Sequence, residues 1–240
     1  DKPSRLSSLH KRVIDKYFIP LKTDQVYMLG NSQDDLDRVS GDVVIATDRM
    51  STYPVLGMRK FQKRFYFVQD YEPYFFARGS SSILTEQSYA SHNDFSCICA
   101  SPWLKKRMES FGNSAMSFPL AVDHSVYHHD VEEQRSRNTI AFYVRRSTPR
   151  RLYELGLLAL RALFDLGDNF EIITFGEKDL PDLGIPVKVK HAGILDASAL
   201  ANLYRECTIG FVLSGTNYSL VPNEMMACGL PVVDIDAEHT

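Results

Sequence analysis

The sequence predicts an α/β protein made of two successive Rossmann-like units. Short apolar strands alternate with amphipathic helices along most of the 240 residues. Several strands, such as 42–47 and 208–213, are largely apolar, which is typical of parallel strands covered on both faces. A polar stretch over 128–138 interrupts the alternation, which then starts again. We expect domains at 1–130 and 139–240, joined by a linker at 131–138.

The first unit opens on a basic, helix-like stretch at 4–17 rather than on a strand. Its helix at 102–111 has the clearest ends, with Ser101 as the N-cap, Pro102 at the first helical position and Gly112 as the stop. The other expected elements are strands at 42–47, 64–69, 95–100 and 114–118, and helices at 51–60 and 80–91.

In the second unit, Thr148-Pro149 should cap a long helix that ends at Gly167. Its expected buried stripe is Leu152, Leu155, Ala159, Ala162, Leu163 and Leu166. The remaining elements are strands at 139–144, 170–175, 187–190, 208–213 and 231–235, a helix at 197–206 capped by Asp196, and a helix at 222–228. Because this unit stops after a strand, we expect the chain to be an internal piece of a longer protein.

Composition excludes several classes of function. The formal net charge of −3 argues against a general nucleic-acid-binding protein. The sequence contains no run of about eighteen apolar residues, so it predicts no membrane span. Peripheral association is the only membrane contact that we expect. The four cysteines form no C-x-x-C pair, and we expect small buried thiols in a reducing compartment: Cys97, Cys99, Cys207 and Cys228. The predicted location is therefore cytoplasmic, with the inner membrane surface as an option.

The first candidate site is the predicted helix that Pro222 opens and Gly229 stops, with Glu224 in its first turn. A helix N-terminus presents free N–H groups that welcome a phosphate. A carboxylate one turn away can accept hydrogen bonds from the vicinal hydroxyls of a ribose. The alternative is that Glu224 only compensates the helix dipole, which is worth about 0.3–1 kcal/mol.

The second candidate site is an arginine-rich turn between strand 139–144 and the next helix. It contains Arg145, Arg146, Arg150 and Arg151. Ligands of open α/β sheets bind at this edge, and the planar guanidinium group suits phosphate. A solvated basic loop is the alternative. It is disfavoured because cations at a helix N-terminus oppose the dipole.

These motifs resemble the retaining GT-B glycosyltransferases of the family-4 type. The similar runs are Glu-Met-Met-Ala-Cys-Gly-Leu-Pro-Val at 224–232 and Pro-Leu-Ala-Val-Asp-His-Ser-Val-Tyr at 119–127. The chain looks closest to the rhamnan-type rhamnosyltransferase branch. Phe-Val-Gln-Asp-Tyr-Glu-Pro at 67–73 and Ser-Gly-Thr-Asn-Tyr-Ser at 214–219 are similar to signatures of that branch.

The resemblance implies a GT-B fold, in which two Rossmann-like domains face a cleft, with both domains incomplete in this chain. It implies that Glu224 binds the ribose of a nucleotide sugar, and that Arg145 and Arg150 neutralise the leaving diphosphate as catalytic groups. The implied donor-binding residues are Thr216, Asn217, Tyr218, Ser219, Leu220, Val221 and Glu224. No metal and no cofactor are implied, because arginines stabilise the developing negative charge.

The implied function is transfer of rhamnose from dTDP-rhamnose to a glycan acceptor in surface polysaccharide synthesis, with retention and without a metal. Two alternatives stay open: a non-catalytic nucleotide-sugar-binding module, and a family-4 transferase that uses a UDP- or GDP-sugar. The chain departs from the family at three positions. Thr216 replaces the first of two paired acids, Val144 replaces a glycine, and Arg150 stands at the position of a lysine.

Further acids and histidines could carry chemistry. Asp70 and Glu72 follow a predicted strand and are acceptor-side candidates, although a turn-forming role is equally consistent. Asp234-Ile235-Asp236 mimics a metal-binding D-x-D motif, but we expect solvated acids at a strand end. Adjacent histidines at 128–129 lack an evident third ligand and suit a linker better. A nucleotide-sugar epimerase or dehydrogenase would need a G-x-G-x-x-G motif, which is absent.

Overall fold

The computed structural model describes residues 29–30, 32–129 and 138–240. The chain divides into two compact units, Asp1–Phe65 and Tyr66–Thr240, and each is described by itself. The predicted helix at 4–17 and all but the last residue of the predicted linker lie outside the described residues. The predicted domain boundaries therefore stay a prediction.

The first unit contains α2 (Gln33–Leu36), β1 (Gly41–Ala46), α3 (Arg49–Gly57) and the start of β2 (Phe61–Val68). This confirms the predicted strand and helix, with ends shifted by one to three residues. The α3 helix begins after Asp48, whose side chain accepts a hydrogen bond from the Ser51 backbone N–H. The sequence predicted a buried strand here, but β1 is only partly buried: Val43 is 45% exposed and Ile45 is 49% exposed.

The second unit begins with the end of β2 and two further strands of its sheet. The elements are η1 (Glu72–Phe75), α4 (Ser80–Gln87), η2 (Ser91–Asn93), β3 (Ser96–Cys99), α5 (Pro102–Ser110) and β4 (Ser114–Ser117). The strand order is β1-β2-β3-β4, and β3 pairs with β4 in parallel. Ser101 caps α5 as predicted, accepting from the Leu104 N–H. The four cysteines are buried free thiols, as predicted.

A five-stranded sheet follows. Its elements are β5 (Thr139–Tyr143), η3 (Pro149–Arg151), α6 (Tyr153–Leu166), β6 (Glu171–Phe175), β7 (Lys188–Gly193), α7 (Ala197–Glu206), β8 (Ile209–Phe211), α8 (Leu220–Ala227) and β9 (Val232–Val233). The strand order is β7-β6-β5-β8-β9, and all neighbouring pairs are parallel. This is the order of a doubly wound sheet, in which the chain reverses direction across the sheet between β5 and β8. The predicted parallel α/β fold is confirmed.

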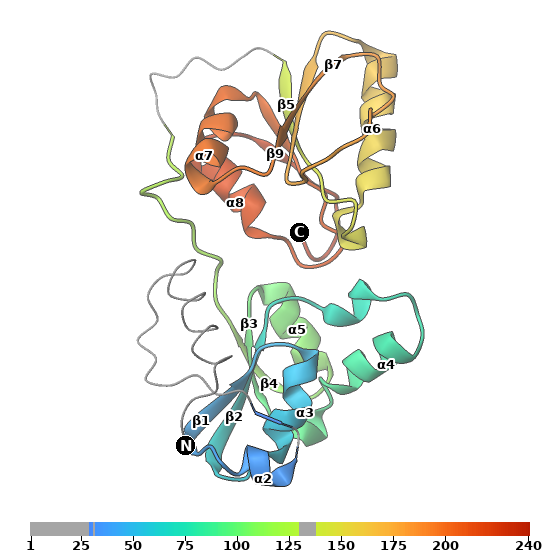
Figure 1. The fold of residues 1–240 in the computed structure, drawn as a ribbon. Helices are drawn as coiled ribbons and strands as arrows, with labels where there is room; N and C mark the ends of the chain where they lie inside the picture. The colour runs from blue at the N-terminus through green and yellow to red at the C-terminus, as the bar shows by residue number, and fades with distance from the viewer. Residues whose placement is uncertain (1–28, 31, 130–137) are drawn as a thin grey trace. The chain divides into compact units, whose positions relative to one another are not determined.

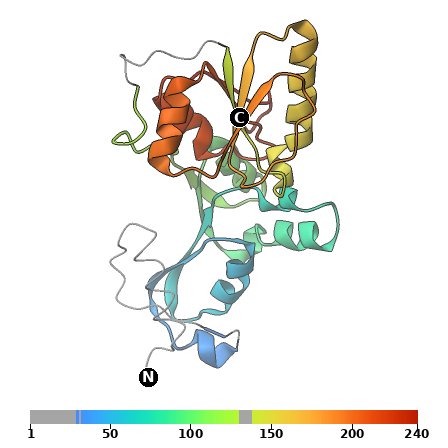
Figure 2. The same ribbon diagram turned by 45° about the horizontal axis from the view of Figure 1, so that its top comes forward.

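Helices cover both faces of this sheet, with α6 on one face and α7 and α8 on the other (Figures 1 and 2). Alternate residues of β5 point to opposite faces. Ile140 and Phe142 join the core that includes Leu160 of α6, whereas Ala141 joins the core that includes Tyr204 of α7. No helix among the described residues is long and apolar enough to cross a membrane.

The start of α6 differs from the prediction. Pro149 does not open the long helix, because Pro149–Arg151 forms a 3-10 turn and Leu152 has a left-handed φ of 48°. The helix begins at Tyr153 and ends before Gly167, as predicted at that end. The arginines therefore lie on a separate turn before the helix.

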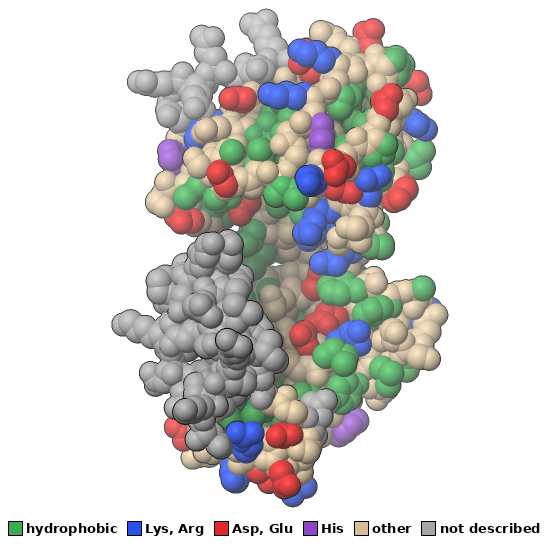
Figure 3. Space-filling view, in the orientation of Figure 1, with side chains coloured by type: hydrophobic (Ala, Val, Ile, Leu, Met, Phe, Trp, Pro, Cys, Tyr) green, Lys and Arg blue, Asp and Glu red, His purple; other side chains and the backbone are tan. Residues whose placement is uncertain are grey.

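The buried face of α6 was also predicted wrongly. Leu155 is 44% exposed and Leu166 is 89% exposed, whereas the buried residues are Tyr153, Gly156 and Leu160. Gly156 lies so close to β5 that an added Cβ would come within 2.6 Å of the Phe142 ring. A face centred on a glycine is missed when apolar residues alone are counted. Figure 3 shows hydrophobic side chains at the surface in the region of α6.

The α8 helix begins earlier than predicted. It starts at Leu220, so Pro222 is its third residue and Glu224 its fifth, beyond the first turn. Proline is tolerated there because the first N–H groups of a helix have no partner within the helix. Gly229, with a φ of 74°, stops the helix as predicted. Glu224 therefore lies further from the free N–H groups than the sequence suggested.

Candidate functional site

Several predicted site residues lie in loops at the carboxyl ends of parallel strands, around the point where the order of the five-stranded sheet reverses. The arginine loop follows β5, and the loop that contains Thr216 and Asn217 follows β8. Asp70 follows the end of β2. Open α/β sheets bind ligands outside the carboxyl ends of their strands at such a reversal.

The loops after β5 and β8 touch each other through their backbones. The Gly215 N–H donates to the Arg150 carbonyl at 2.8 Å. A Cβ on Gly215 would lie 3.2 Å from that carbonyl oxygen and 3.1 Å from the Leu152 side chain. Gly215 therefore permits a close approach that places Arg150 beside Thr216.

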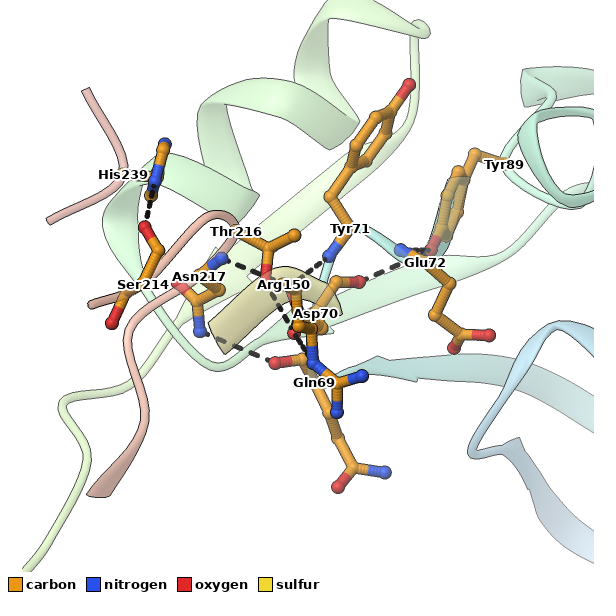
Figure 4. A network of polar contacts seen from close by, with 10 residues as sticks. All are labelled: Gln69, Asp70, Tyr71, Glu72, Tyr89, Arg150, Ser214, Thr216, Asn217 and His239. Carbon is orange, nitrogen blue, oxygen red and sulfur yellow. Dashed lines mark hydrogen bonds and ion pairs between the residues drawn. The ribbon is translucent and has the colours of Figure 1, made fainter. Parts of the chain in front are cut away.

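Asp70 joins these loops to the end of β2 (Figure 4). Its Oδ2 accepts from the Thr216 Oγ1 at 3.0 Å, and its Oδ1 accepts from the Asn217 N–H at 3.1 Å and the Tyr71 N–H at 2.8 Å. The Arg150 Nε lies 3.6 Å from Oδ2, an ion-pair distance beyond a hydrogen bond. An acceptor-side candidate and three donor-side candidates are thus in direct contact.

The Asp70 carboxylate lies in a largely buried environment that disfavours its charged form. Its side chain is 14% exposed. Burial raises the pKa of Asp70 above its ordinary value, although its three hydrogen bonds and the Arg150 charge oppose the rise. A buried acid with a perturbed pKa at a strand end is typical of a functional site.

The four arginines of the loop have different surroundings. Arg146 is held by Glu177, whose carboxylate it contacts through Nη2 at 3.1 Å and through its backbone N–H at 2.8 Å. Arg150 lies over the Phe75 ring, with 4.1 Å between its Cζ and the ring centroid. Arg151 lies over a tyrosine ring, and burial lowers its pKa. Arg145 is exposed, and within the described part of the chain its guanidinium has no ion pair or hydrogen bond.

Buried polar atoms without a hydrogen bond concentrate in the same two loops. Among the described residues, these atoms include Arg150 Nε, Arg151 Nη1, Ser214 Oγ, Asn217 Oδ1 and Ser219 Oγ. Native proteins leave few such groups unsatisfied, and each needs an explanation such as a water or a bound ligand. Their clustering favours a polar ligand at this edge of the sheet.

Asp234 is hydrogen-bonded to the loop after β8. Its Oδ1 accepts from the Ser214 N–H at 2.8 Å and from the Ile235 N–H at 2.7 Å. The expected solvated acid is therefore wrong for Asp234, which is part-buried and fixes the start of the Ser214–Asn217 loop. In the described ranges, no group of three or more His, Cys, Asp or Glu side chains could hold a metal ion.

Among the described residues, the Glu224 carboxylate makes no hydrogen bond or ion pair with the Asp70 network. Its carboxylate is half-buried, and burial raises its pKa. Its charge contributes, after burial, to raising the pKa of Tyr127 to about 12 and that of Tyr204 further. No interaction between Glu224 and Arg145 or Arg150 is found among the described residues. The two halves of the predicted donor site are therefore not joined by a direct contact.

The remaining donor-loop candidates are more varied. Tyr218 and Ser219 are half-buried, Leu220 is 42% exposed, and Val221 packs against the core that includes Met225. Both residues keep part of their surface exposed, although the Ser219 Oγ itself is buried without a hydrogen bond. Val221 contributes packing instead.

A cavity of about 320 Å³ lies beside the acceptor-side candidate Glu72. The Tyr71 hydroxyl donates to Glu86 at 3.0 Å, and the Arg107 guanidinium lies 4.7 Å from the centroid of the Tyr71 ring. The lining residues are Tyr71, Pro73, Tyr74, Phe76, Arg78, Ser82, Glu86 and Arg107. An aromatic wall with charged groups at its edge suits a sugar ring.

Sequence reasoning missed several residues that shape the site. Glu177 neutralises Arg146, Phe75 supports Arg150, and Gly215 allows the loops to meet. Glu177 and Gly215 each follow a predicted strand, and that position is a signal that could have found them. No sequence signal pairs Phe75 with Arg150.

Comparison with known proteins extends this picture. Residues 138–238 match the family described as WsaF, C-terminal domain. The chain is 37% identical over 199 residues to the O-antigen biosynthesis protein RfbC of Myxococcus xanthus. That match covers 81% of this chain and 16% of RfbC, so the chain spans about a sixth of this relative.

Solved structures with low sequence identity share the fold. Anabaena HepE, in complex with UDP and glucose, matches with a TM-score of 0.64 at 16% identity, over 95% of this chain and 70% of HepE. Sucrose-phosphate synthase from Thermosynechococcus elongatus matches with a TM-score of 0.62 at 15% identity, over 80% of this chain and 55% of the synthase. The mixed α/β fold with parallel sheets is that of GT-B glycosyltransferases.

Proposed function

We propose that this chain belongs to a glycosyltransferase that moves a sugar from a nucleoside diphosphate to a growing surface glycan. The observation that carries the proposal is the convergence of Arg150, Thr216 and Asn217 at the reversal point of the sheet, next to buried polar atoms without partners. The match to an O-antigen biosynthesis protein supports the choice of glycan.

Arg145 and Arg150 would hold the diphosphate. Glycosyl transfer breaks the bond between the anomeric carbon and the diphosphate oxygen, and the electron pair stays on the diphosphate. Fixed cations stabilise that developing negative charge. Arg145 has an unengaged guanidinium, and Arg150 is positioned by Asp70 and Phe75. This chemistry needs neither a metal nor another cofactor.

Glu224 would accept hydrogen bonds from the ribose hydroxyls. Its half-buried carboxylate lacks a described partner, so the cost of its burial would be offset by a ligand. Tyr218 and Ser219 would line the sugar pocket, since both follow the loop that Asp70 fixes. Glu72 and the adjacent cavity would lie on the acceptor side.

The finer proposal is that the donor is dTDP-rhamnose and that the reaction proceeds with retention. It is supported by the resemblance of residues 67–73 and 214–219 to the rhamnosyltransferase branch. A UDP- or GDP-sugar is the alternative donor. We place the reaction in the cytoplasm, at the inner membrane surface, with no nucleic-acid partner.

A second candidate function is a module that binds a nucleotide sugar without turnover. The observation that favours it is Thr216, an uncharged residue at the position where the similar family has an acid. Incubation of the full-length protein with dTDP-[¹⁴C]rhamnose and a glycan acceptor separates the two functions. Labelled glycan supports the transferase. Binding of the donor without labelled glycan supports the binding module.

A further inference from the structure

Asp70 has one hydrogen-bond acceptor position that the described residues leave open. An ionised carboxylate offers about four lone-pair sites. Tyr71 and Asn217 N–H groups fill the two sites of Oδ1, and the Thr216 hydroxyl fills one of Oδ2. Arg150 Nε, at 3.6 Å, is too far from Oδ2 for a hydrogen bond.

The open acceptor position of Asp70 lies on the solvent-accessible side of the hydrogen-bond network that Asp70 forms with the two loops. Thr216 is 1% exposed and Asn217 is 3% exposed, whereas the side chains of Asp70 and Arg150 are 14% and 29% exposed. The Thr216 hydroxyl has its single proton directed at Asp70. Asp70 and Arg150 are therefore the residues of this network that a ligand can reach, and Asp70 is the acceptor of the two.

The pair of Asp70 and Arg150 matches the chemistry of a sugar hydroxyl. A hydroxyl group both donates and accepts a hydrogen bond. It can donate to Asp70 Oδ2 while its oxygen accepts from the adjacent guanidinium, and hydrogen bonds to charged groups are the stronger ones. Residues 214–219 contain no acid, so the carboxylate beside this loop comes from the end of β2 instead.

We propose that Asp70 accepts a hydrogen bond from a hydroxyl group of the transferred sugar, and so determines specificity on the donor side. This assignment rests on the proposed function, and it moves Asp70 from the acceptor side to the sugar of the donor. Thr216 and Asn217 act as positioning residues that fix both carboxylate oxygens.

The test compares a nucleotide sugar with its nucleoside diphosphate in calorimetric titrations of the full-length protein. The probes are dTDP and dTDP-rhamnose, with UDP and UDP-glucose as a second pair. For Asp70→Asn, we expect the affinity for the nucleotide sugar to fall about 10- to 100-fold. The affinity for the nucleoside diphosphate should change by less than about threefold, because this ligand has no sugar to contact Asp70 and because Arg150 is also held over the Phe75 ring.

Two further variants sharpen the comparison. Thr216→Val keeps the side-chain volume, removes the hydrogen bond that orients Oδ2, and should lower the nucleotide-sugar affinity in the same selective way. Should Asp70→Asn fail to fold, Thr216→Val decides. Glu171→Gln is the control, because Glu171 is a carboxylate at the start of β6 that pairs with Lys188 at 2.8 Å, at the opposite end of the strand from the loops. It should leave the ratio of the two affinities unchanged.

The failures of the two proposals are distinguishable. A wild-type protein that binds none of the four probes, and neither GDP nor GDP-mannose, contradicts the proposed function. A wild-type protein that binds them, with Asp70→Asn affecting sugar nucleotide and nucleoside diphosphate equally or not at all, overturns the assignment of Asp70 alone.

Discussion

Thr216 donates a hydrogen bond to Asp70 at 3.0 Å, although the two residues lie 146 positions apart in the sequence. The contact joins the end of β2 to the loop after β8. It brings a carboxylate to a loop that has none of its own, and it places that carboxylate beside Arg150. The ligand-binding argument depends on this junction.

Arg145 and Arg146 are neighbours with opposite expected roles. Arg145→Ala should weaken nucleoside diphosphate binding about tenfold or more, because an unengaged guanidinium is available to the phosphates. Arg146→Ala should leave the affinity within about threefold, and it should cost only about 0.2–1 kcal/mol of stability, because its exposed ion pair with Glu177 is lost.

Calorimetry with dTDP and UDP, together with urea unfolding, checks both variants. Equal loss of affinity in the two variants would show that the whole loop acts as a diffuse positive patch. The distinction between an engaged and an unengaged arginine would then be wrong.

The stability of the protein should depend on pH through Asp70. Its folded-state pKa is raised above its ordinary value of 3.8, so the folded state binds this proton more tightly than the unfolded state. Its contribution to stability is therefore present below about pH 3.8 and is lost as the pH rises through the folded-state pKa. Asp70→Asn carries no such proton and should escape this loss.

Urea unfolding of wild type and Asp70→Asn from about pH 3 to about pH 7 measures the effect. The free energy of unfolding of the variant, minus that of wild type, should increase with pH over the window that starts near 3.8. A difference that stays constant, or decreases with pH, would contradict the direction of the pKa shift.

The corrected buried face of α6 gives a stability prediction. Leu160 is 2% exposed and Leu158 is 60% exposed, two residues apart on the same helix. Leu160→Ala should lower the free energy of unfolding by about 2–5 kcal/mol. Leu158→Ala should change it by no more than about 0.5 kcal/mol. A larger effect at Leu158 than at Leu160 in denaturant unfolding would mean that the helix is rotated.

Local signals in the sequence were sufficient for much of the fold. The alternation of strands and helices predicted both sheets, and Ser101, Asp196 and Gly229 correctly marked helix ends. These features depend on neighbouring residues only. The caps need a side-chain oxygen next to free N–H groups, and the stop needs a residue that adopts a positive φ.

Features that depend on tertiary packing were not predictable in the same way. The face of α6 is set by the contact of Gly156 with Phe142, and an apolar count gives a glycine no weight. Glu224 lies in the second turn of α8 because the helix begins before Pro222.

The sequence predicted which residues belong to the candidate site, but it did not predict which of them contact one another. Arg150, Thr216 and Asn217 were predicted for the donor side, and they do meet. Their meeting point at Asp70 could not be predicted, because no local pattern couples segments so far apart.

The most direct test of the central claim is calorimetric titration of wild type and Glu224→Ala with dTDP, UDP and GDP, alongside the thermal unfolding midpoint. At least one of the three should bind wild type and raise its midpoint, because a ligand that binds only the folded state stabilises it. Glu224→Ala should lower that affinity about tenfold or more. No binding to wild type, or an unchanged affinity in the variant, would contradict a nucleoside diphosphate site formed with Glu224.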